Sequence, residues 1–208
     1  MTRPFALLPA VLAMAAVVTA SNILVQFRMG DFLTWGAWTY PLAFLVTDVT
    51  NRIAGPGAAR RVVAAGFLAG LACSLVAALL GSMTIRIALA SGSAFLAAQM
   101  IDIAVFDRLR TGSWWRAPLV STLVSSTLDT VIFFSVAFAG TFAWIDPADD
   151  VAWAAERVPL WFGHGPQVPL WAALGAADWS VKLLLAAIAL IPFRAIVADL
   201  LRRRAEMG

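Results

Sequence analysis

The sequence has few of the residues on which most catalytic and metal sites are built. It contains one cysteine, Cys73, and one histidine, His164, so it has no internal disulfide and no Cys/His metal cluster. Charged residues make up 13% of the chain, whereas soluble domains usually have about a quarter. The sequence also has no glycine-rich phosphate-binding loop, so any associated ATPase must be a separate chain. We therefore expect no metal site and no cofactor.

Long apolar runs are what the sequence has in abundance. Hydrophobic residues make up 62% of the chain, and its mean hydropathy is +0.86. A membrane-spanning helix needs about 20 mostly apolar residues. We predict an all-α integral membrane protein, one transmembrane domain over residues 1–208, whose six spans are roughly Phe5–Val25, Leu33–Thr50, Val62–Leu80, Thr84–Phe106, Pro118–Trp144 and Pro169–Phe193.

The first apolar run has a second interpretation. Arg3, the run itself and the small residues Thr19-Ala20-Ser21 resemble a secretory signal peptide with its cleavage site. We expect a retained first helix instead, because the run is long and its removal would leave an odd number of spans.

The basic residues are divided unequally between the two sides of the predicted spans. Cytoplasmic loops carry an excess of Lys and Arg, so we predict that both termini are cytoplasmic and that the loop Ile145–Val168 is external. The net charge of +3 then reflects orientation, and we expect no direct binding of nucleic acid. Of the 15 basic residues, Lys182 lies within a span, three lie on the external side (Arg28, Arg86, Arg157) and 11 on the cytoplasmic side: Arg3, Arg52, Arg60, Arg61, Arg108, Arg110, Arg116, Arg194, Arg202, Arg203 and Arg204.

Four carboxylates and one lysine fall inside the predicted spans: Asp48, Asp102, Asp129, Asp178 and Lys182. A charge at the centre of a bilayer costs at least ~2.5–3.5 kcal/mol, so it is retained where it faces a partner, a cavity or a substrate. Asp178 and Lys182 are one helical turn apart. They form either a structural ion pair or part of a site for binding or proton movement.

Asp48 has polar neighbours at helical spacing. Asn51, three residues later, shares its helix face, and Arg52, four residues later, offers the alternative of a local salt bridge. Pro41, seven residues earlier, removes a backbone donor and favours a kink or break in the helix.

Two further polar stripes accompany the other carboxylates. Gln99 and Asp102 share one face of the fourth span. Ser121, Ser125 and Asp129 recur at four-residue intervals in the fifth span, and their stripe either packs helices together or lines a site.

A different stripe in the third span contains only small residues. Gly66, Gly70, Ser74 and Ala78 recur every four residues. This spacing predicts close packing against another helix, and we assign it no chemistry.

Several of these residues belong to motifs that closely resemble the queuosine precursor transporter family, in order and over nearly the whole chain. The external segment Asp146–Gln167 resembles that family least. The matching motifs are Ser21-Asn22 to Val25-Gln26, Thr34-Trp35-Gly36-Ala37 to Tyr40-Pro41, Phe44, Thr47-Asp48, Asn51-Arg52, Gln99-Met100-Ile101-Asp102, Val105 to Arg110, Trp114-Trp115, Ala117-Pro118, Ser121-Thr122, Asp129-Thr130, Phe133-Phe134, and Asp178 with Lys182.

This resemblance implies a stand-alone importer in the inner membrane, with 7-cyano-7-deazaguanine and its aminomethyl form as substrates. The residues suit such a ligand. A carboxylate accepts both donors of a guanine-like edge, and aromatic rings stack on the flat bicycle. We expect one shared cavity, and the predicted substrate-binding residues are Phe44, Asp48, Asn51, Gln99, Asp102, Phe106, Ser125, Asp129, Phe133, Asp178, Trp179 and Lys182.

Three alternatives are open at this stage. In the first alternative, the chain is the substrate-capture subunit of an ATP-driven vitamin or nucleobase importer, and a separate ATPase is its partner. It is an intramembrane enzyme with paired carboxylates, although no nucleophile or metal cluster supports catalysis. Or it is a scaffold, which leaves the intramembrane charges unexplained. The expected partners are the lipid bilayer and a deazaguanine substrate. Formation of a homo-oligomer is a further alternative.

Overall fold

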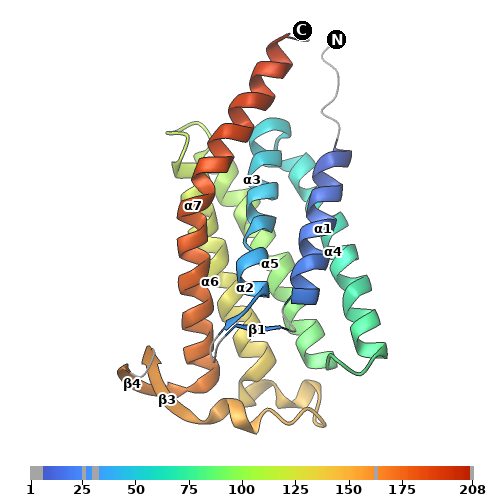
Figure 1. The fold of residues 1–208 in the computed structure, drawn as a ribbon, viewed down its shortest axis with the longest axis vertical. Coiled ribbons are helices and arrows are strands. Elements are labelled where there is room, and N and C mark those ends of the chain that lie inside the picture. The colour runs from blue at the N-terminus through green and yellow to red at the C-terminus, as the bar shows by residue number, and fades with distance from the viewer. Residues whose placement is uncertain (1–6, 25–26, 30–32, 162–163, 207–208) are drawn as a thin grey trace.

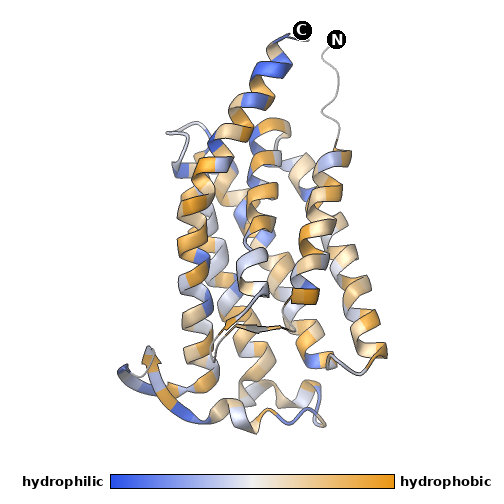
Figure 2. Cartoon of the chain, viewed as in Figure 1, coloured by the Kyte–Doolittle hydropathy of each residue, from blue (hydrophilic) through white to orange (hydrophobic). Residues whose placement is uncertain are grey.

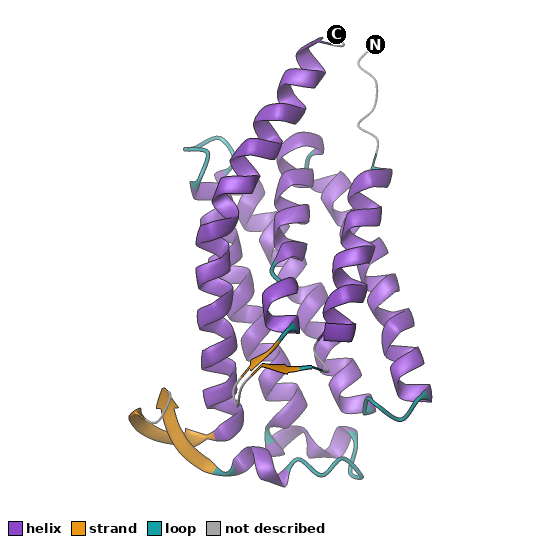
Figure 3. Cartoon of the chain, in the orientation of Figure 1, coloured by secondary structure: helices purple, strands orange, loops and turns teal. Residues whose placement is uncertain are grey.

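The computed structural model describes residues 7–24, 27–29, 33–161 and 164–206, and most of these residues are helical (Figures 1 and 3). The predicted motif residues Val25 and Gln26, and Arg3 and Phe5, lie outside this part of the chain. The helices are α1 (Leu8–Leu24), α2 (Gly36–Thr39), α3 (Leu42–Ala54), α4 (Pro56–Leu79), α5 (Ile85–Leu109), α6 (Arg116–Phe138) and α7 (Leu170–Glu206), with 3-10 helices η1 (Gly140–Ile145) and η2 (Ala152–Ala155).

Within the described residues, four helices are long and apolar enough to cross a membrane: α4, α5, α6 and α7. The apolar helix α1 has 17 residues. Apolar side chains such as Leu68, Leu79 and Ile191 are exposed on the outside of the bundle, and Figure 2 shows hydrophobic residues along the outer helices. The chain is therefore a membrane protein in which lipid covers these side chains.

Among the predicted boundaries that differ from the structure, two concern the ends of the fifth and sixth spans. α6 ends at Phe138 because the backbone becomes extended at Ala139, so the segment predicted to reach Trp144 continues as η1. α7 does not end at Phe193 but continues past Pro192 to Glu206. Its 37 residues correspond to about 55 Å of helix at 1.5 Å per residue, which exceeds the hydrocarbon thickness.

The second predicted span is broken at Pro41, as its missing backbone donor predicts. α2 ends at Thr39 and α3 begins at Leu42. Short turn hydrogen bonds bridge the break, including Ala43 N–H to Tyr40 O at 3.0 Å. The break leaves Tyr40 between the two helices, where its side chain reaches the interior of the bundle.

The small-residue stripe of α4 packs closely against α1, which confirms that prediction. A Cβ atom at Gly66 would lie 2.5 Å from Cγ of Met14, and one at Gly70 would lie 3.1 Å from Cγ1 of Val18. Met14 and Val18 belong to the buried core between these helices. Glycine is therefore what allows the two helices to approach this closely.

The all-α prediction is incomplete, because the structure contains two short antiparallel hairpins. The strands are β1 (Arg28–Met29) with β2 (Leu33–Thr34), and β3 (Arg157–Trp161) with β4 (His164–Pro169). In the second hairpin Val158 pairs with Val168, and Gly165 adopts a left-handed φ of 97°. β-Branched pairs and a left-handed glycine favour a hairpin. We call the end of the bundle that carries β3 and β4 the hairpin end (Figure 1).

The opposite end of the bundle, which we call the basic end, gathers arginines from three places in the chain. Arg52 donates to the backbone oxygen of Arg110, and Arg110 donates to that of Arg52. Arg204 donates to the backbone oxygen of Ile53 at 3.4 Å. The start of α1 and the end of α7 lie at this end too (Figure 1).

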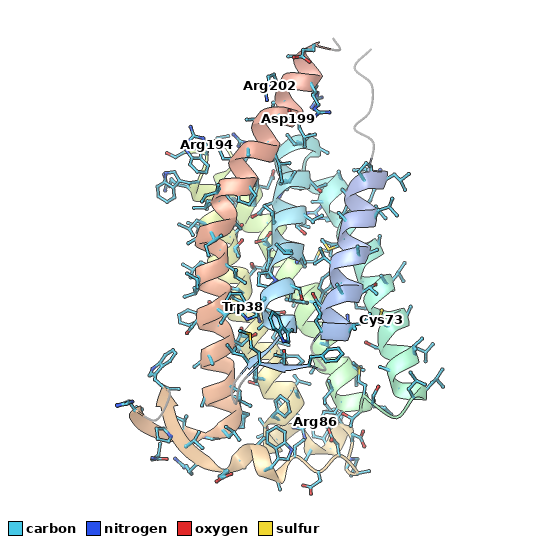
Figure 4. The ribbon with its side chains drawn as sticks, in the orientation of Figure 1. Trp38, Cys73, Arg86, Arg194, Asp199 and Arg202 are labelled. Carbon is cyan, nitrogen blue, oxygen red and sulfur yellow. The ribbon has the colours of Figure 1, made fainter. Side chains whose placement is uncertain are left out.

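Arg86, which the charge distribution assigned to the external side, lies in the first turn of α5. Its side chain is 0% exposed. Nε donates to the backbone oxygen of Val136 at 2.8 Å, and Nη2 donates to that of Ala139 at 2.5 Å. Arg86 therefore satisfies the last carbonyls of α6 near the hairpin end (Figure 4).

Candidate functional site

A cavity of about 600 Å³ lies in the half of the bundle nearer the hairpin end. Its walls come from α1, β2, α2, α5, α6, η2 and α7, and the exposed Ser82 of the α4–α5 turn lies at its rim. Small-molecule sites in proteins usually occupy about 300–1,000 Å³. The cavity is therefore large enough for a bicyclic ligand and accessible from this end.

Three of the predicted charged residues meet in the wall of this cavity. Lys182 Nζ lies 2.7 Å from Asp129 Oδ2 and 2.5 Å from Asp178 Oδ2, and it donates to Thr130 Oγ1 at 3.1 Å. The Asp178–Lys182 ion pair predicted from their spacing is confirmed. Asp129, from α6, is a second partner that spacing within one helix could not reveal. One ammonium therefore pairs with two carboxylates.

Tyr40 completes this charged cluster, and the sequence analysis did not include it among the site residues. Its hydroxyl donates to Asp129 Oδ1 at 3.3 Å, and its ring centroid lies 5.7 Å from Lys182 Nζ. The signal was present, since Tyr40 is the single tyrosine of the chain and directly precedes the helix-breaking Pro41.

The two carboxylates differ in what they can offer a ligand. Both oxygens of Asp129 accept hydrogen bonds from the protein, one from Tyr40 and one from Lys182. Asp178 Oδ2 accepts from Thr130 at 3.2 Å and contacts Lys182, whereas none of the hydrogen bonds among the described residues reaches Oδ1. The Asp178 side chain is 16% exposed and that of Asp129 5%. Asp178 is thus the more exposed of the two carboxylates in the cavity wall.

Aromatic rings form another wall of the cavity, but they are mostly different rings from those predicted. Phe133 lines the cavity, together with Phe134, Phe138 and Trp153. The Phe133 and Phe134 rings are edge-to-face at 5.2 Å. A Cβ atom at Gly175 would lie 3.3 Å from the Phe134 ring. The absence of a side chain at this position of α7 therefore lets the ring pack closely against the helix.

The other three predicted stacking residues lie elsewhere. Trp179 donates its indole N–H to Thr127 Oγ1 at 3.0 Å, away from the cavity. Phe106 packs against Phe193 in the core near the basic end. Phe44 lines a separate small pocket of about 10 Å³. The sequence could not separate these rings from Phe133, because hydrophobic burial and ligand stacking select the same residue types.

A second polar group lies deeper in the bundle, toward the basic end. It contains Asp48, Asp102, Ser121 and Ser125, which we call the inner carboxylate cluster. Ser121 Oγ donates to Asp48 Oδ1 at 3.4 Å, and Ser125 Oγ donates to Asp102 Oδ1 at 3.0 Å. All four side chains are buried. The predicted alternative of an Asp48–Arg52 salt bridge is wrong, since Arg52 instead donates to the backbone of Arg110.

Two predicted amides border the inner carboxylate cluster. Gln99 Oε1 accepts from Thr47 Oγ1 at 2.6 Å, and Asn51 Nδ2 donates to the backbone oxygen of Ile103 at 3.1 Å. Gln99 Nε2 and Asn51 Oδ1 are buried without a partner among the described residues. Both amides thus face the interior, as their spacing to the carboxylates predicted.

The expectation of one shared cavity is wrong for this conformation. Asp129, Asp178, Lys182 and Phe133 line the 600 Å³ cavity. The remaining predicted residues do not line it, and they are Phe44, Asp48, Asn51, Gln99, Asp102, Phe106, Ser125 and Trp179. The cost of membrane charge predicts that polar residues avoid lipid, but it does not say that they all meet in one place.

Comparison with known proteins adds a family to this geometry. The family described as "Putative vitamin uptake transporter" matches residues 34–197. A "Queuosine precursor transporter" of Escherichia coli (strain K12) is 33% identical over 207 residues, covering 90% of this chain and 84% of the relative. A "Probable queuosine precursor transporter" of Haemophilus influenzae is 33% identical over 190 residues, covering 84% and 72%. No solved structure matches.

Proposed function

The chain belongs to the vitamin uptake transporter family, and we propose from this membership that it imports queuosine precursors, 7-cyano-7-deazaguanine and 7-aminomethyl-7-deazaguanine. The structural observation that supports it is the 600 Å³ cavity, where Asp178 Oδ1 accepts no hydrogen bond from the described residues. Relatives at 33% identity over most of the chain bear the name of this transport activity.

The substrate's guanine-like edge would bind at Asp178. That edge presents a ring N–H and an exocyclic amine, and a carboxylate accepts two such donors side by side. Lys182 and Asp129 hold Asp178 in place, while hydroxyls that line the same cavity, such as Thr34 and Ser91, can donate to the substrate carbonyl. Phe133 and the rings beside it supply a stacking surface.

The transporter would act alone in the inner membrane, with six spans and both termini in the cytoplasm. In this arrangement α1 and the broken α2–α3 segment are the two spans beyond α4, α5, α6 and α7. The gathering of arginines at the basic end supports the orientation, and the cavity then faces the outside. The alternative, a capture subunit of an ATP-driven importer, has no specific observation in its favour.

Labelling of introduced cysteines tests the orientation. In a Cys73→Ser background, Asp150→Cys should react with an impermeant thiol reagent in intact cells, whereas Arg203→Cys should react only after permeabilisation. Both positions are exposed, so accessibility within the protein is matched. The reverse labelling pattern would overturn the proposed topology.

Queuosine salvage tests the function. In a strain that cannot make queuosine precursors, deletion of this protein should abolish the appearance of queuosine in tRNA after 7-cyano-7-deazaguanine is supplied. The modified base is measured by mass spectrometry of digested tRNA, and a plasmid-borne copy should restore it. Undiminished queuosine in the deletion strain, with no second importer present, would sink the proposal.

A further inference from the structure

The inner carboxylate cluster holds two buried acids side by side. Asp48 and Asp102 lie within hydrogen-bonding reach of each other, and their side chains are 3% and 0% exposed. Neither forms an ion pair with any described Lys or Arg, unlike Asp129 and Asp178. Two buried carboxylates this close, with no described cation paired to either, cannot both be ionised. A hydrogen bond between them requires one proton.

Unsatisfied polar atoms point to the same place. Asp102 Oδ2 and Gln99 Nε2, one turn apart on α5, are buried and have no hydrogen-bond partner in the described part of the chain. Asp48 borders the small pocket of about 10 Å³, a volume comparable to a single water. The cluster is therefore not a fully satisfied structural network, and it has room and acceptors for a proton and a water molecule.

Polar side chains on one face of α6 extend from this cluster to the cavity wall. Asp129 lines the cavity, Ser125 donates to Asp102, and Ser121 donates to Asp48. These three residues are four apart, so each step along the helix rises about 6 Å. The acids thus lie beyond the inner wall of the cavity, one to two helical turns closer to the basic end.

From this geometry we infer that Asp48 and Asp102 form the proton-carrying site that couples import to the proton gradient. The inference rests on the proposed transport function and adds the driving ion. With the cavity open at the hairpin end, as here, the pair holds one proton taken from the external side. When the basic end opens instead, the pair releases this proton to the cytoplasm together with the substrate. One proton then moves inward for each substrate molecule.

Several charged residues on α3, α5, α6 and α7 bind groups other than the pair. On α3, Arg52 points to the backbone of Arg110 on α5. Arg110 also pairs with Asp107 at 3.1 Å. Asp129 on α6 and Lys182 on α7 bind each other in the cavity wall. The residues of α6 and α7 beside the small pocket are Pro118, Thr122, Ala186, Ala189, Leu190 and Phe193, none of which is charged.

Uptake into proteoliposomes tests the coupling. The purified protein is reconstituted with the membrane potential clamped at zero, and radiolabelled 7-cyano-7-deazaguanine is supplied outside. With the outside one pH unit more acidic, one proton per substrate permits accumulation up to about tenfold over equilibrium. The double variant Asp48→Asn/Asp102→Asn should still bind the substrate, shown by a ligand-induced thermal shift, but should lose this accumulation. The matched control is Asp199→Asn, which removes an exposed carboxylate paired with Arg202 and Arg203.

Each outcome of this experiment decides the inference. Accumulation by the wild-type protein that is independent of the pH gradient, or that follows a sodium gradient, would overturn it. So would full accumulation by the double variant. If the double variant does not fold, the single variants Asp48→Asn and Asp102→Asn test the inference instead. Unchanged pH profiles of accumulation in both single variants would show that the pair does not carry the coupled proton. If the wild-type protein neither binds nor admits 7-cyano-7-deazaguanine, the proposed function fails instead.

Discussion

Replacing Lys182 with methionine should abolish uptake of 7-cyano-7-deazaguanine. Lys182 is the cation that pairs with both Asp129 and Asp178 in the cavity wall. Removing one partner of a buried ion pair typically costs about 3–5 kcal/mol, because the remaining charge is stranded. We therefore expect uptake in the complemented deletion strain to fall by at least about 100-fold, with a parallel loss of thermal stability in detergent.

Two double variants separate neutralisation from substrate contact. Asp129→Asn/Lys182→Met leaves Asp178, which faces the cavity, and should recover stability and part of the uptake relative to Lys182→Met alone. Asp178→Asn/Lys182→Met should fold but remain inactive, because the carboxylate that receives the guanine-like edge is gone. Uptake near the wild-type level in this second variant would show that the Asp178–Lys182 pair is only structural. Asp107→Asn, at an exposed ion pair with Arg110, serves as the matched control.

Replacing Gly66 with leucine should destabilise the protein by separating α1 from α4. A Cβ at this position already lies 2.5 Å from Met14 Cγ and 3.4 Å from the Phe95 ring. Met14 is fully buried, so its side chain has little space into which to move. Overpacking of a core typically costs about 1–3 kcal/mol. We expect a lower melting temperature in detergent and less protein in the membrane fraction.

A compensating change and a control make this prediction specific. Met14→Ala removes the side-chain atoms that the introduced leucine would meet, so the double variant Gly66→Leu/Met14→Ala should regain much of the lost stability. Gly57→Ala, in the first turn of the same helix, has nothing within 4 Å of its new Cβ and should be neutral. Equal losses at Gly57 and Gly66 would attribute the effect to helix flexibility instead of packing.

Local sequence patterns were reliable wherever the physics itself is local. Pro41 breaks the second predicted span because it lacks a backbone donor, whatever surrounds it. The Asp178–Lys182 pair forms because residues four apart meet on any helix. The close packing of α4 follows from the small residues at Gly66 and Gly70, although their spacing could not name α1 as the partner.

Several predictions were wrong because the same residue type can serve either packing or function. Phe106 and Trp179 are aromatic residues within predicted spans, as a stacking residue must be. Phe106 instead packs in the core, and Trp179 donates a hydrogen bond to Thr127. Arg86 was counted among the basic residues of the external side, but its side chain is buried and satisfies the end of α6. The β3–β4 hairpin was missed because its short strands carry little apolar periodicity.

The sequence by itself determined that this chain is a membrane protein and that its carboxylates avoid lipid, because both follow from transfer free energies that each residue carries with it. Which charges of different helices meet was decided only by the tertiary structure. The orientation of α6 relative to α5 and α7 places Asp129 beside Lys182 and Ser125 beside Asp102. The break at Pro41 places Tyr40 beside Asp129. Contacts between helices depend on packing geometry that no spacing within one helix encodes. That geometry separates the cavity from the inner carboxylate cluster.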